Sequence, residues 1–558
     1  MLRKCFLVFM VCIVKMATGQ SVEEAKKFLY YDRFASAEAV LKQLIQKEPG
    51  NTTAYYWLSQ TALQTGDTAA ARKAIEDVQQ LKQANSKLDV DPMVEAGRIH
   101  LLLIDGKKEE AKAASEQLVK ETKGKNAEVI RALAKAQVAV KQGQGDYDYA
   151  LTLVDQAIKR DKKNPENYII MGDAWRRKGD GGNAVSGYMQ AIAVEPGYAR
   201  ASYSIGKVYL TQQNANVYLE HFLKAVQQDA NFSPAYYELY YHFYYRDVNE
   251  AKKYLEKFIA TADKTVENDY MLTDLAYVSS KKQEAIDMAR KLLQQEGEKA
   301  RPRLYKLIAY SYDDLGDSLK ALDYISTYFE KEQPEKYISK DYALKAELLV
   351  KVKDSAGREQ AIEYWQKAVE ADTLVTAKID YMRSIAAAYK KMGDRSQEAG
   401  WLGKIVNLKE EPSNLDIYYW GLAHYAAGEY KMADSAFGIY SEKYPDQVHG
   451  YLWRAKSNAV IDSTMEQGLA VPYYTKVIEI ADDDAKTNKS LLIQAYGYIG
   501  AYEANVEKDY PEALEHFKKI LELDPANTDA GRYSEILQKW IDAGTTKPES
   551  ESKTDTSH

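Results

Sequence analysis

Apolar and polar residues follow one another along most of the chain with the three- to four-residue spacing of amphipathic helices, and the helices come in pairs. In residues 414–445, Trp420 belongs to a first helix and Gly428 stands at a turn. Phe437 follows in a second helix that stops at Pro445. Glycine tolerates the left-handed backbone that ends a first helix, and proline cannot continue a second one. The pattern therefore predicts two helices joined by a tight turn.

The same pair of helices returns along the chain. Ala37 and Ala71, which both lie early in a second helix, are 34 residues apart. A small residue at this place lets the two helices approach closely. Comparable units centre on Ala37, Ala71, Ala111, Ala150, Ala184, Tyr218, Ala251, Ala285, Ala321, Ala361, Ala399, Ala433, Leu469 and Ala513. No unit can bury its apolar faces alone, so the units must stack on one another.

This unit resembles the tetratricopeptide repeat, whose pattern is a large residue, Leu-Gly, Tyr, Ala, an aromatic residue, Ala and Pro. Residues 414–445 carry the pattern as Trp420, Gly421, Tyr430, Ala433, Phe437 and Pro445. The resemblance implies an all-α fold, an α-solenoid in which about 13–14 stacked antiparallel helix pairs form a right-handed superhelix. An amphipathic helix at residues 528–543 is expected to cap the last open face.

The sequence also suggests domain boundaries. A weak joint at residues 294–303 is expected to separate an N-terminal array, 20–300, from a C-terminal array, 301–543. Residues 544–558 are rich in Thr, Ser, Lys and Glu and have almost no apolar side chain. Such a composition cannot bury enough apolar surface to order a chain, so it predicts a disordered tail.

Residues 1–19 have the composition of a secretory signal peptide. Arg3 and Lys4 precede an apolar run, and residues 17–19 are small residues before a cut at Gln20. The alternative is a membrane anchor, but this run is too short to cross the ~30 Å of hydrocarbon in a bilayer. We therefore expect a periplasmic protein without a transmembrane segment after cleavage, peripherally associated with an outer-membrane complex.

Both cysteines, Cys5 and Cys12, lie in the predicted signal peptide. The mature chain therefore has neither a disulfide nor thiol chemistry. Neither cysteine has the small-residue context of a lipoprotein cleavage site, which disfavours a lipid anchor. The formal net charge is −7 with the charges interspersed. Binding to nucleic acid needs a concentrated basic surface, so we expect other proteins or peptide segments as partners and no nucleic acid.

No residue pattern predicts catalysis, a metal or a cofactor. The seven histidines include no pair at the spacing of a helical metal site. Ser204 and Lys207 formally match a Ser-x-x-Lys nucleophile motif. Gly206, however, falls at the glycine position of the repeat, and the accompanying Lys-Thr-Gly is absent. The sequence thus favours a protein that is not an enzyme.

The resemblance implies that first helices line a concave groove that receives an extended peptide or a helix. The candidate groove residues are Arg176, Arg177, Arg200, Tyr203, Lys207, Arg303, Lys306, Tyr310, Tyr418, Leu422 and Tyr425. Arginine can hold carboxylates with two hydrogen bonds, and tyrosine offers amphipathic contact area. The alternative is that these residues form an ordinary solvated face.

A second candidate surface is the aromatic segment 236–245, which is apolar around its whole circumference. Its candidate patch consists of Tyr236, Tyr237, Tyr240, Tyr241 and Tyr244. Such a helix is either buried on all sides or exposes a patch to a partner.

Several Asp-Ser and Asp-Thr pairs followed by small or apolar residues resemble the O-glycosylation acceptors of exported Bacteroidota proteins. The candidate acceptors are Thr68, Ser318, Ser355, Thr373, Ser435 and Ser463. Asp before Ser or Thr also caps helices for purely structural reasons, and the sequence leaves both interpretations open.

The function expected from these features is a non-catalytic periplasmic scaffold or adaptor, an accessory subunit of an outer-membrane assembly or secretion complex. The alternative is a soluble carrier or chaperone that holds extended peptides or glycans in its groove. A third class, a helical enzyme, would require a deep pocket with clustered acids.

Overall fold

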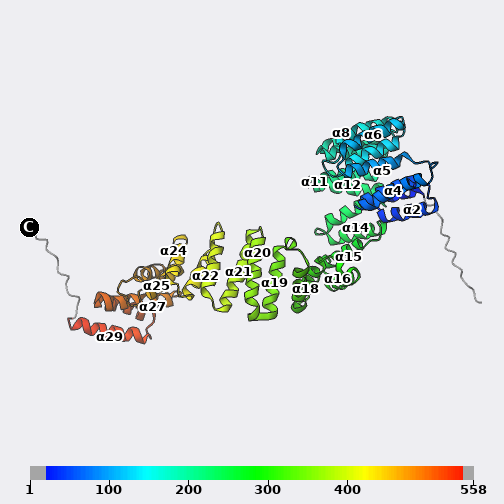
Figure 1. The fold of residues 1–558 in the computed structure, drawn as a ribbon. Helices are drawn as coiled ribbons and strands as arrows, with labels where there is room; N and C mark the ends of the chain where they lie inside the picture. Colours follow the sequence, from blue (N-terminus) through cyan, green and yellow to red (C-terminus); the bar gives the residue numbers. More distant parts are fainter. Residues whose placement is uncertain (1–20, 545–558) are drawn as a thin grey trace, which may run out of the picture. The chain divides into compact units, whose positions relative to one another are not determined.

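The computed structural model describes residues 21–544, and within this range it contains helices and no strand (Figure 1). The predicted signal peptide, 1–19, and the predicted tail from residue 545 onward lie outside the described residues. The chain divides into two compact units between Gly297 and Glu298.

The helices of the first unit are α1 (Val22–Tyr30), α2 (Phe34–Lys47), α3 (Thr52–Gln64), α4 (Thr68–Ala84), α5 (Pro92–Ile104), α6 (Lys108–Glu121), α7 (Ala127–Ala139), α8 (Tyr147–Arg160), α9 (Pro165–Arg177), α10 (Gly181–Val194), α11 (Ala199–Thr211), α12 (Ala215–Gln228), α13 (Ser233–Phe243), α14 (Val248–Thr261), α15 (Val266–Val278) and α16 (Lys282–Glu296). Those of the second unit are α17 (Arg303–Asp314), α18 (Ser318–Lys331), α19 (Ser339–Lys353), α20 (Arg358–Ala371), α21 (Val375–Met392), α22 (Arg395–Leu408), α23 (Asn414–Ala426), α24 (Tyr430–Lys443), α25 (Val448–Ile461), α26 (Val471–Ala481), α27 (Lys489–Tyr502), α28 (Tyr510–Leu523) and α29 (Thr528–Asp542). Short helical turns are η1 (Gly297–Lys299), η2 (Pro334–Lys336), η3 (Asp354–Gly357), η4 (Asp482–Asp484) and η5 (Glu503–Glu507).

In this part of the chain, helices α1 to α28 form fourteen consecutive pairs. Each helix packs against its partner and, within each unit, against the next pair. Helix α29 packs on α28 and covers the end of the last pair. The predicted all-α solenoid of stacked helix pairs is confirmed.

Tight turns join the two helices of a pair, and glycine at these turns has a left-handed backbone. Five of these turn glycines have φ between 76° and 84°, among them Gly428, which the sequence places at a turn: Gly66, Gly179, Gly316, Gly393 and Gly428. Gln213 and Ser280 take the same place in two pairs without glycine, with φ of 56° and 60°. A residue with a Cβ pays roughly 1–2 kcal/mol for this conformation, which explains why glycine prevails at the turns.

The small residue of each second helix is buried, as its spacing predicts. Twelve of the alanines on which the units centre are fully buried, at 0% exposure: Ala37, Ala71, Ala111, Ala150, Ala184, Ala251, Ala285, Ala321, Ala361, Ala399, Ala433 and Ala513. In the unit that the sequence centres on Leu469, the fully buried residue is instead its neighbour Ala470. In thirteen of the fourteen described pairs, close contact between the paired helices therefore involves one short buried side chain, and the pair with Tyr218 is the exception.

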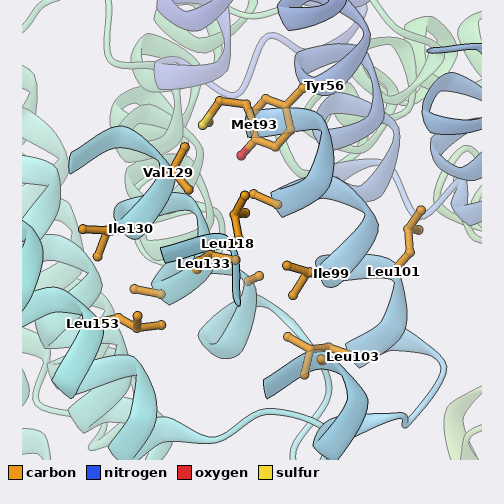
Figure 2. Packing of buried hydrophobic residues seen from close by; sticks show 14 of the residues in the cluster. Tyr56, Met93, Ile99, Leu101, Leu103, Leu118, Val129, Ile130, Leu133 and Leu153 are labelled. Atoms are coloured by element: carbon orange, nitrogen blue, oxygen red, sulfur yellow. The ribbon is translucent and has the colours of Figure 1, made fainter. Parts of the chain in front are cut away.

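Around these alanines the larger apolar residues of successive pairs form continuous cores. Figure 2 shows the core of helices α5 to α8, where Ile99, Leu103, Leu133 and Leu153 are buried together. Each such side chain stabilises the fold by about 1.5–3 kcal/mol relative to an exposed one. Between residues 21 and 544, no helix combines the length and hydrophobicity needed to span a membrane.

Candidate partner-binding surfaces

Arg200, a predicted groove residue, lies on α11 and contacts the end of α1 and the turn that follows it. Its guanidinium donates hydrogen bonds to the main-chain oxygens of Leu29, at 3.1 Å, and Tyr30. It also lies 3.3 Å from the carboxylate of Asp32. Burial alone would lower the pKa of Arg200, but the negative charges of Asp32 and Glu166 outweigh burial and raise it. Arg200 is therefore a charged, internally bonded side chain of the first unit.

The other predicted groove residues of the fifth and sixth pairs also have intramolecular partners. The ring of Tyr203 packs edge-on against Phe232, with centroids 5.5 Å apart, and Lys207 lies 2.7 Å from Glu238 on α13. Arg177 donates to the main-chain oxygen of Val138 at 2.9 Å. The remaining residue of this set, Arg176, lies 3.6 Å from Asp173.

In the ninth pair, two predicted groove residues converge on a buried acid. Asp341 of α19 has a side chain without exposed surface, at 0%. It lies 2.7 Å from the ammonium of Lys306 and accepts a hydrogen bond from Tyr310 at 3.0 Å. It also accepts from the main-chain amide of Ile338 at 3.1 Å. Lys306 and Tyr310 thus tie α17 to α19, while Arg303 begins α17.

In the twelfth pair, the predicted groove residues are half-buried against the next pair. Tyr418 accepts a hydrogen bond from the Trp453 indole at 3.2 Å. The ring of Tyr425 meets the same indole edge-on, with centroids 5.0 Å apart. Leu422 packs in the same cluster as these residues.

The aromatic segment is divided between the core and the surface of α13. Tyr236 and Tyr240 are buried, and the Tyr244 hydroxyl donates to the main-chain oxygen of Asp274. Tyr237 and Tyr241 are exposed, and their rings meet edge-on at 4.7 Å. These two rings are one helical turn apart, and Tyr245, which is 86% exposed, follows beyond the end of α13, so the exposed rings form a narrow stripe rather than a broad patch.

The candidate glycosylation residues lie in three kinds of place. Thr68 and Ser318 are the first residues of α4 and α18, directly after aspartates whose side chains cap those helices. Ser355, Thr373 and Ser463 are exposed outside the long helices. Ser435 lies inside α24 and donates a hydrogen bond to the main-chain oxygen of Lys431 at 3.0 Å.

A hollow of about 440 Å³ lies in the second unit between α21, α22 and α23. Its apolar floor comes from Ala386, Leu402 and Ile405. At its edge, Leu415 and Tyr419 leave 57% and 54% of their surface exposed. The hollow is therefore bordered by apolar side chains that the rest of the described unit leaves largely exposed.

The hollow is lined by two bases and two acids, and each acid has a close basic partner outside the lining. Glu398 lies 2.8 Å from Arg395, and Asp416 lies 2.6 Å from Lys409. Burial alone would raise the pKa of Asp416, but hydrogen bonds from Lys409 and Ser413 outweigh burial and lower it to about 2. Each acid is thus paired with a base that lies outside the lining of the hollow.

Two partly exposed basic side chains of α21, Arg383 and Lys390, form the basic rim of the hollow. Arg383 is 3.4 Å from the exposed Asp380 of its own helix and 3.5 Å from Asp416, Lys390 is 3.8 Å from Glu398, and both bases are more than half exposed. Contacts of this length and exposure contribute little, so both charges are available to an anionic group.

Sequence reasoning missed these residues although a signal for them existed. Tyr418, Leu422 and Tyr425 precede the turn glycine Gly428 by 10, 6 and 3 positions. The same count back from Gly393 reaches three residues that line the hollow: Arg383, Ala387 and Lys390. Extending the inner-face positions to the eleventh pair would have found the basic rim.

A further hollow, of about 500 Å³, lies between α27, α28 and α29 and is lined mostly by apolar residues that include Phe517 and Tyr533. Among residues 21–544 no group of His, Cys, Asp and Glu is arranged to hold a metal ion. His424 is buried and lies 2.5 Å from Glu429 across its own turn.

Comparison with known proteins agrees with this geometry. A family model described as a tetratricopeptide repeat matches residues 28–88, which span α2 to α4. The chain is a tetratricopeptide-repeat protein. Proteins of this kind generally act as scaffolds for protein–protein interactions.

Similar proteins come from different organisms. The tetratricopeptide-repeat chain is 32% identical to the C-terminal part of a repeat-containing protein from Cytophaga hutchinsonii, covering 47% of this chain and 98% of that one with a TM-score of 0.32. A tetratricopeptide repeat protein from Parabacteroides merdae is 16% identical, covering 46% and 98%, with a TM-score of 0.32. The DnaJ homolog subfamily C member 3 of Gallus gallus is 24% identical over 210 residues, which are 36% of this chain and 40% of the chicken protein. The match thus spans less than half the length of that relative.

Proposed function

We propose that this chain is a non-catalytic periplasmic scaffold that binds peptide segments of other proteins in the hollow between α21 and α23. The observation that carries the proposal is the pairing of a basic rim with exposed apolar side chains around one recess. Charge complementarity fixes the orientation of a bound segment, and apolar burial supplies affinity.

The chemistry of the rim defines the partner segment. An apolar side chain that covers Leu415 and Tyr419 removes exposed apolar surface from water. A carboxylate on each side of it can reach Arg383 and Lys390, and the arginine can bind with two hydrogen bonds. We therefore propose that the partner presents an apolar residue flanked by acids.

A fluorescent probe peptide tests this proposal by anisotropy. The probe carries leucine and phenylalanine flanked by glutamates, and a matched probe carries lysines in place of the glutamates. The full chain should bind the acidic probe, and binding should weaken as salt screens the charges. Arg383→Glu/Lys390→Glu should weaken binding by about tenfold or more, which corresponds to about 1.4 kcal/mol.

A variant with the same change of charge elsewhere is the control. Lys391 and Lys431 are exposed and do not line the hollow. Lys391→Glu/Lys431→Glu should therefore retain the affinity of the unmodified chain. Equal loss in both variants, or equal binding of the lysine probe, would show that the hollow does not select acidic segments.

Export and membrane association form a separate part of the proposal. They are supported by the basic start, apolar run and small residues of segment 1–19. Protein purified from the periplasmic fraction should have the intact mass of a chain that begins at Gln20. Its partner should be an outer-membrane assembly or secretion complex, recovered with it in stoichiometric amount. A chain that retains residues 1–19 in the cytoplasmic fraction contradicts this part alone.

A further inference from the structure

The first unit contains contacts that a simple stack of repeats does not provide. In a solenoid each repeat contacts its neighbours only. Here the segment between α1 and α2 bonds to residues 168 to 230 positions further along the chain. We call residues 28–36 the closing segment, and Arg200, Asp229, Ser233 and Asp263 the anchor residues. The anchor residues belong to α11, the start of α13 and the loops after α12 and α14.

The anchor residues hold the main chain of the closing segment as well as its side chains. Arg200 donates to the main-chain oxygens of Leu29 and Tyr30, and the Ser233 hydroxyl donates to that of Tyr31 at 2.5 Å. Asp229 accepts a hydrogen bond from the Tyr31 hydroxyl at 2.9 Å. Main-chain hydrogen bonding is a common way in which proteins recognise peptides.

Asp263 supplies a helix cap from a distant part of the sequence. Helix α2 has no side-chain cap of its own, since Arg33 makes no such bond. The carboxylate of Asp263 accepts from the amides of Ala35, at 2.7 Å, and Ser36, at 3.2 Å. These amides belong to the first turn of a helix, where no partner exists within the helix. A negative charge at this end also interacts favourably with the helix dipole.

Aromatic packing completes the contact. The ring of Tyr30 lies 5.3 Å from those of Tyr198 and Phe232, and the Arg200 guanidinium lies 5.2 Å from the Tyr30 centroid. Phe232 is fully buried, at 0% exposure. The closing segment thus fills an apolar recess with one aromatic side chain and satisfies polar groups on both sides of it.

We propose that the anchor residues form a peptide-recognition site whose resident ligand is the chain's own closing segment, and that this contact closes the first unit. Its ligand is a segment in which two aromatic residues and an acid stand just before the start of a helix. This site is separate from the hollow of the second unit, so the two proposals are tested independently.

Hydrogen exchange measured by mass spectrometry tests the closure in the full chain. Asp263→Ala removes the distant cap but keeps the bond from Asn268, which uses the main-chain oxygen of Asp263. Exchange in peptides covering residues 34–37 should accelerate at least tenfold. Asp247→Ala is the matched control, because Asp247 caps α14 within its own pair. It should accelerate exchange in α14 and leave residues 34–37 unchanged. Unchanged exchange there in Asp263→Ala overturns the closure.

A peptide added in trans tests recognition. Tyr30→Ala/Tyr31→Ala weakens the resident ligand and leaves the anchor residues intact. A fluorescein-labelled peptide of residues 21–48 should bind this variant at least tenfold more tightly than the unmodified chain, where the tethered segment competes at high effective concentration. Adding Arg200→Ala should abolish the gain.

The remaining outcomes are also decisive. If the tyrosine variant does not fold, as judged by circular dichroism, Arg33→Ala/Ser36→Ala replaces it, because these side chains contact Asp263. Equal affinity of the peptide for the opened and unmodified chains, or no binding to either opened variant, overturns the recognition site.

Discussion

Asp341 joins two predicted groove residues, and its replacement shows whether they serve the fold or a partner. Its buried carboxylate lies 2.7 Å from the Lys306 ammonium and accepts a hydrogen bond from Tyr310 at 3.0 Å. Asp341→Asn keeps the shape of the side chain but removes the charge that faces the Lys306 ammonium. The lysine then keeps its charge next to a neutral group.

The magnitude follows from the burial of the pair. Removing one partner of a buried ion pair costs about 3–5 kcal/mol. The Lys306 side chain is 26% exposed, so water recovers part of the loss. We therefore expect a cost of about 2–3 kcal/mol, which accelerates hydrogen exchange about 30- to 150-fold, since 1.36 kcal/mol corresponds to a factor of ten.

Hydrogen exchange suits this measurement because a solenoid opens locally, and the change should appear in α17 and α19. Asp529→Asn is the control: it removes a carboxylate from an exposed pair with Arg532, worth about 0–1 kcal/mol. Lys306→Met/Asp341→Asn should recover part of the loss, because no charge is left unpaired. Unchanged exchange in Asp341→Asn, or strict additivity of the two changes, refutes the structural role.

Two further predictions concern packing and pH. Gly172→Ala should destabilise α9 and α10 by about 1–3 kcal/mol, because a Cβ would lie 2.4 Å from the ring of Tyr188. Gly182→Ala, whose Cβ would have no neighbour closer than 3.6 Å, should instead stabilise α10 by about 0.5–1 kcal/mol, and hydrogen exchange distinguishes the two. Asp416, with a pKa lowered to about 2, stabilises the fold above its unfolded pKa of about 4 and loses this contribution as pH falls toward 2. Urea unfolding followed by circular dichroism should show this loss, and an unaltered pH dependence in Asp416→Asn contradicts the assignment.

The sequence predicts those features of the fold that depend on neighbouring pairs. Turn glycines such as Gly66 and small residues such as Ala184 recur with the repeat, and the structure confirms their left-handed backbone and their burial. Both features are local, because each pair must turn and pack in the same way as the next. Tyr218, which replaces the alanine in one pair, is buried at the same place.

The contacts of the closing segment cannot be predicted from the local pattern of the repeats. Whether residues near Asp32 reach Asp263 depends on small rotations added over several pairs, and no single repeat encodes that sum. The sequence gives one partial indication of this contact: Arg33, at the start of α2, is not a residue that caps a helix with its side chain. The missing cap points to an external partner but does not identify it.

Inner-face basic residues have different roles that depend on the acids of the following first helix. Lys207 pairs with Glu238 at 2.7 Å and Lys306 with Asp341 at 2.7 Å, so both charges are used within the fold. Arg383 lies 3.5 Å from Asp416, a longer contact, and 3.4 Å from the exposed Asp380 of its own helix.

The difference lies in competition for the acid. Asp416 is already held by Lys409 at 2.6 Å, a residue of the loop between α22 and α23. A carboxylate with a closer cation gains little from a second, distant one, so the contact of Arg383 with Asp416 contributes little, and the guanidinium stays half exposed. A basic residue on the inner face of such an array therefore indicates a binding site only where a nearer cation already neutralises the acid of the next pair. In the described part of the chain Arg383 of the eleventh pair meets that condition, while Lys390 lies 3.8 Å from Glu398 of its own pair, an acid that Arg395 holds at 2.8 Å.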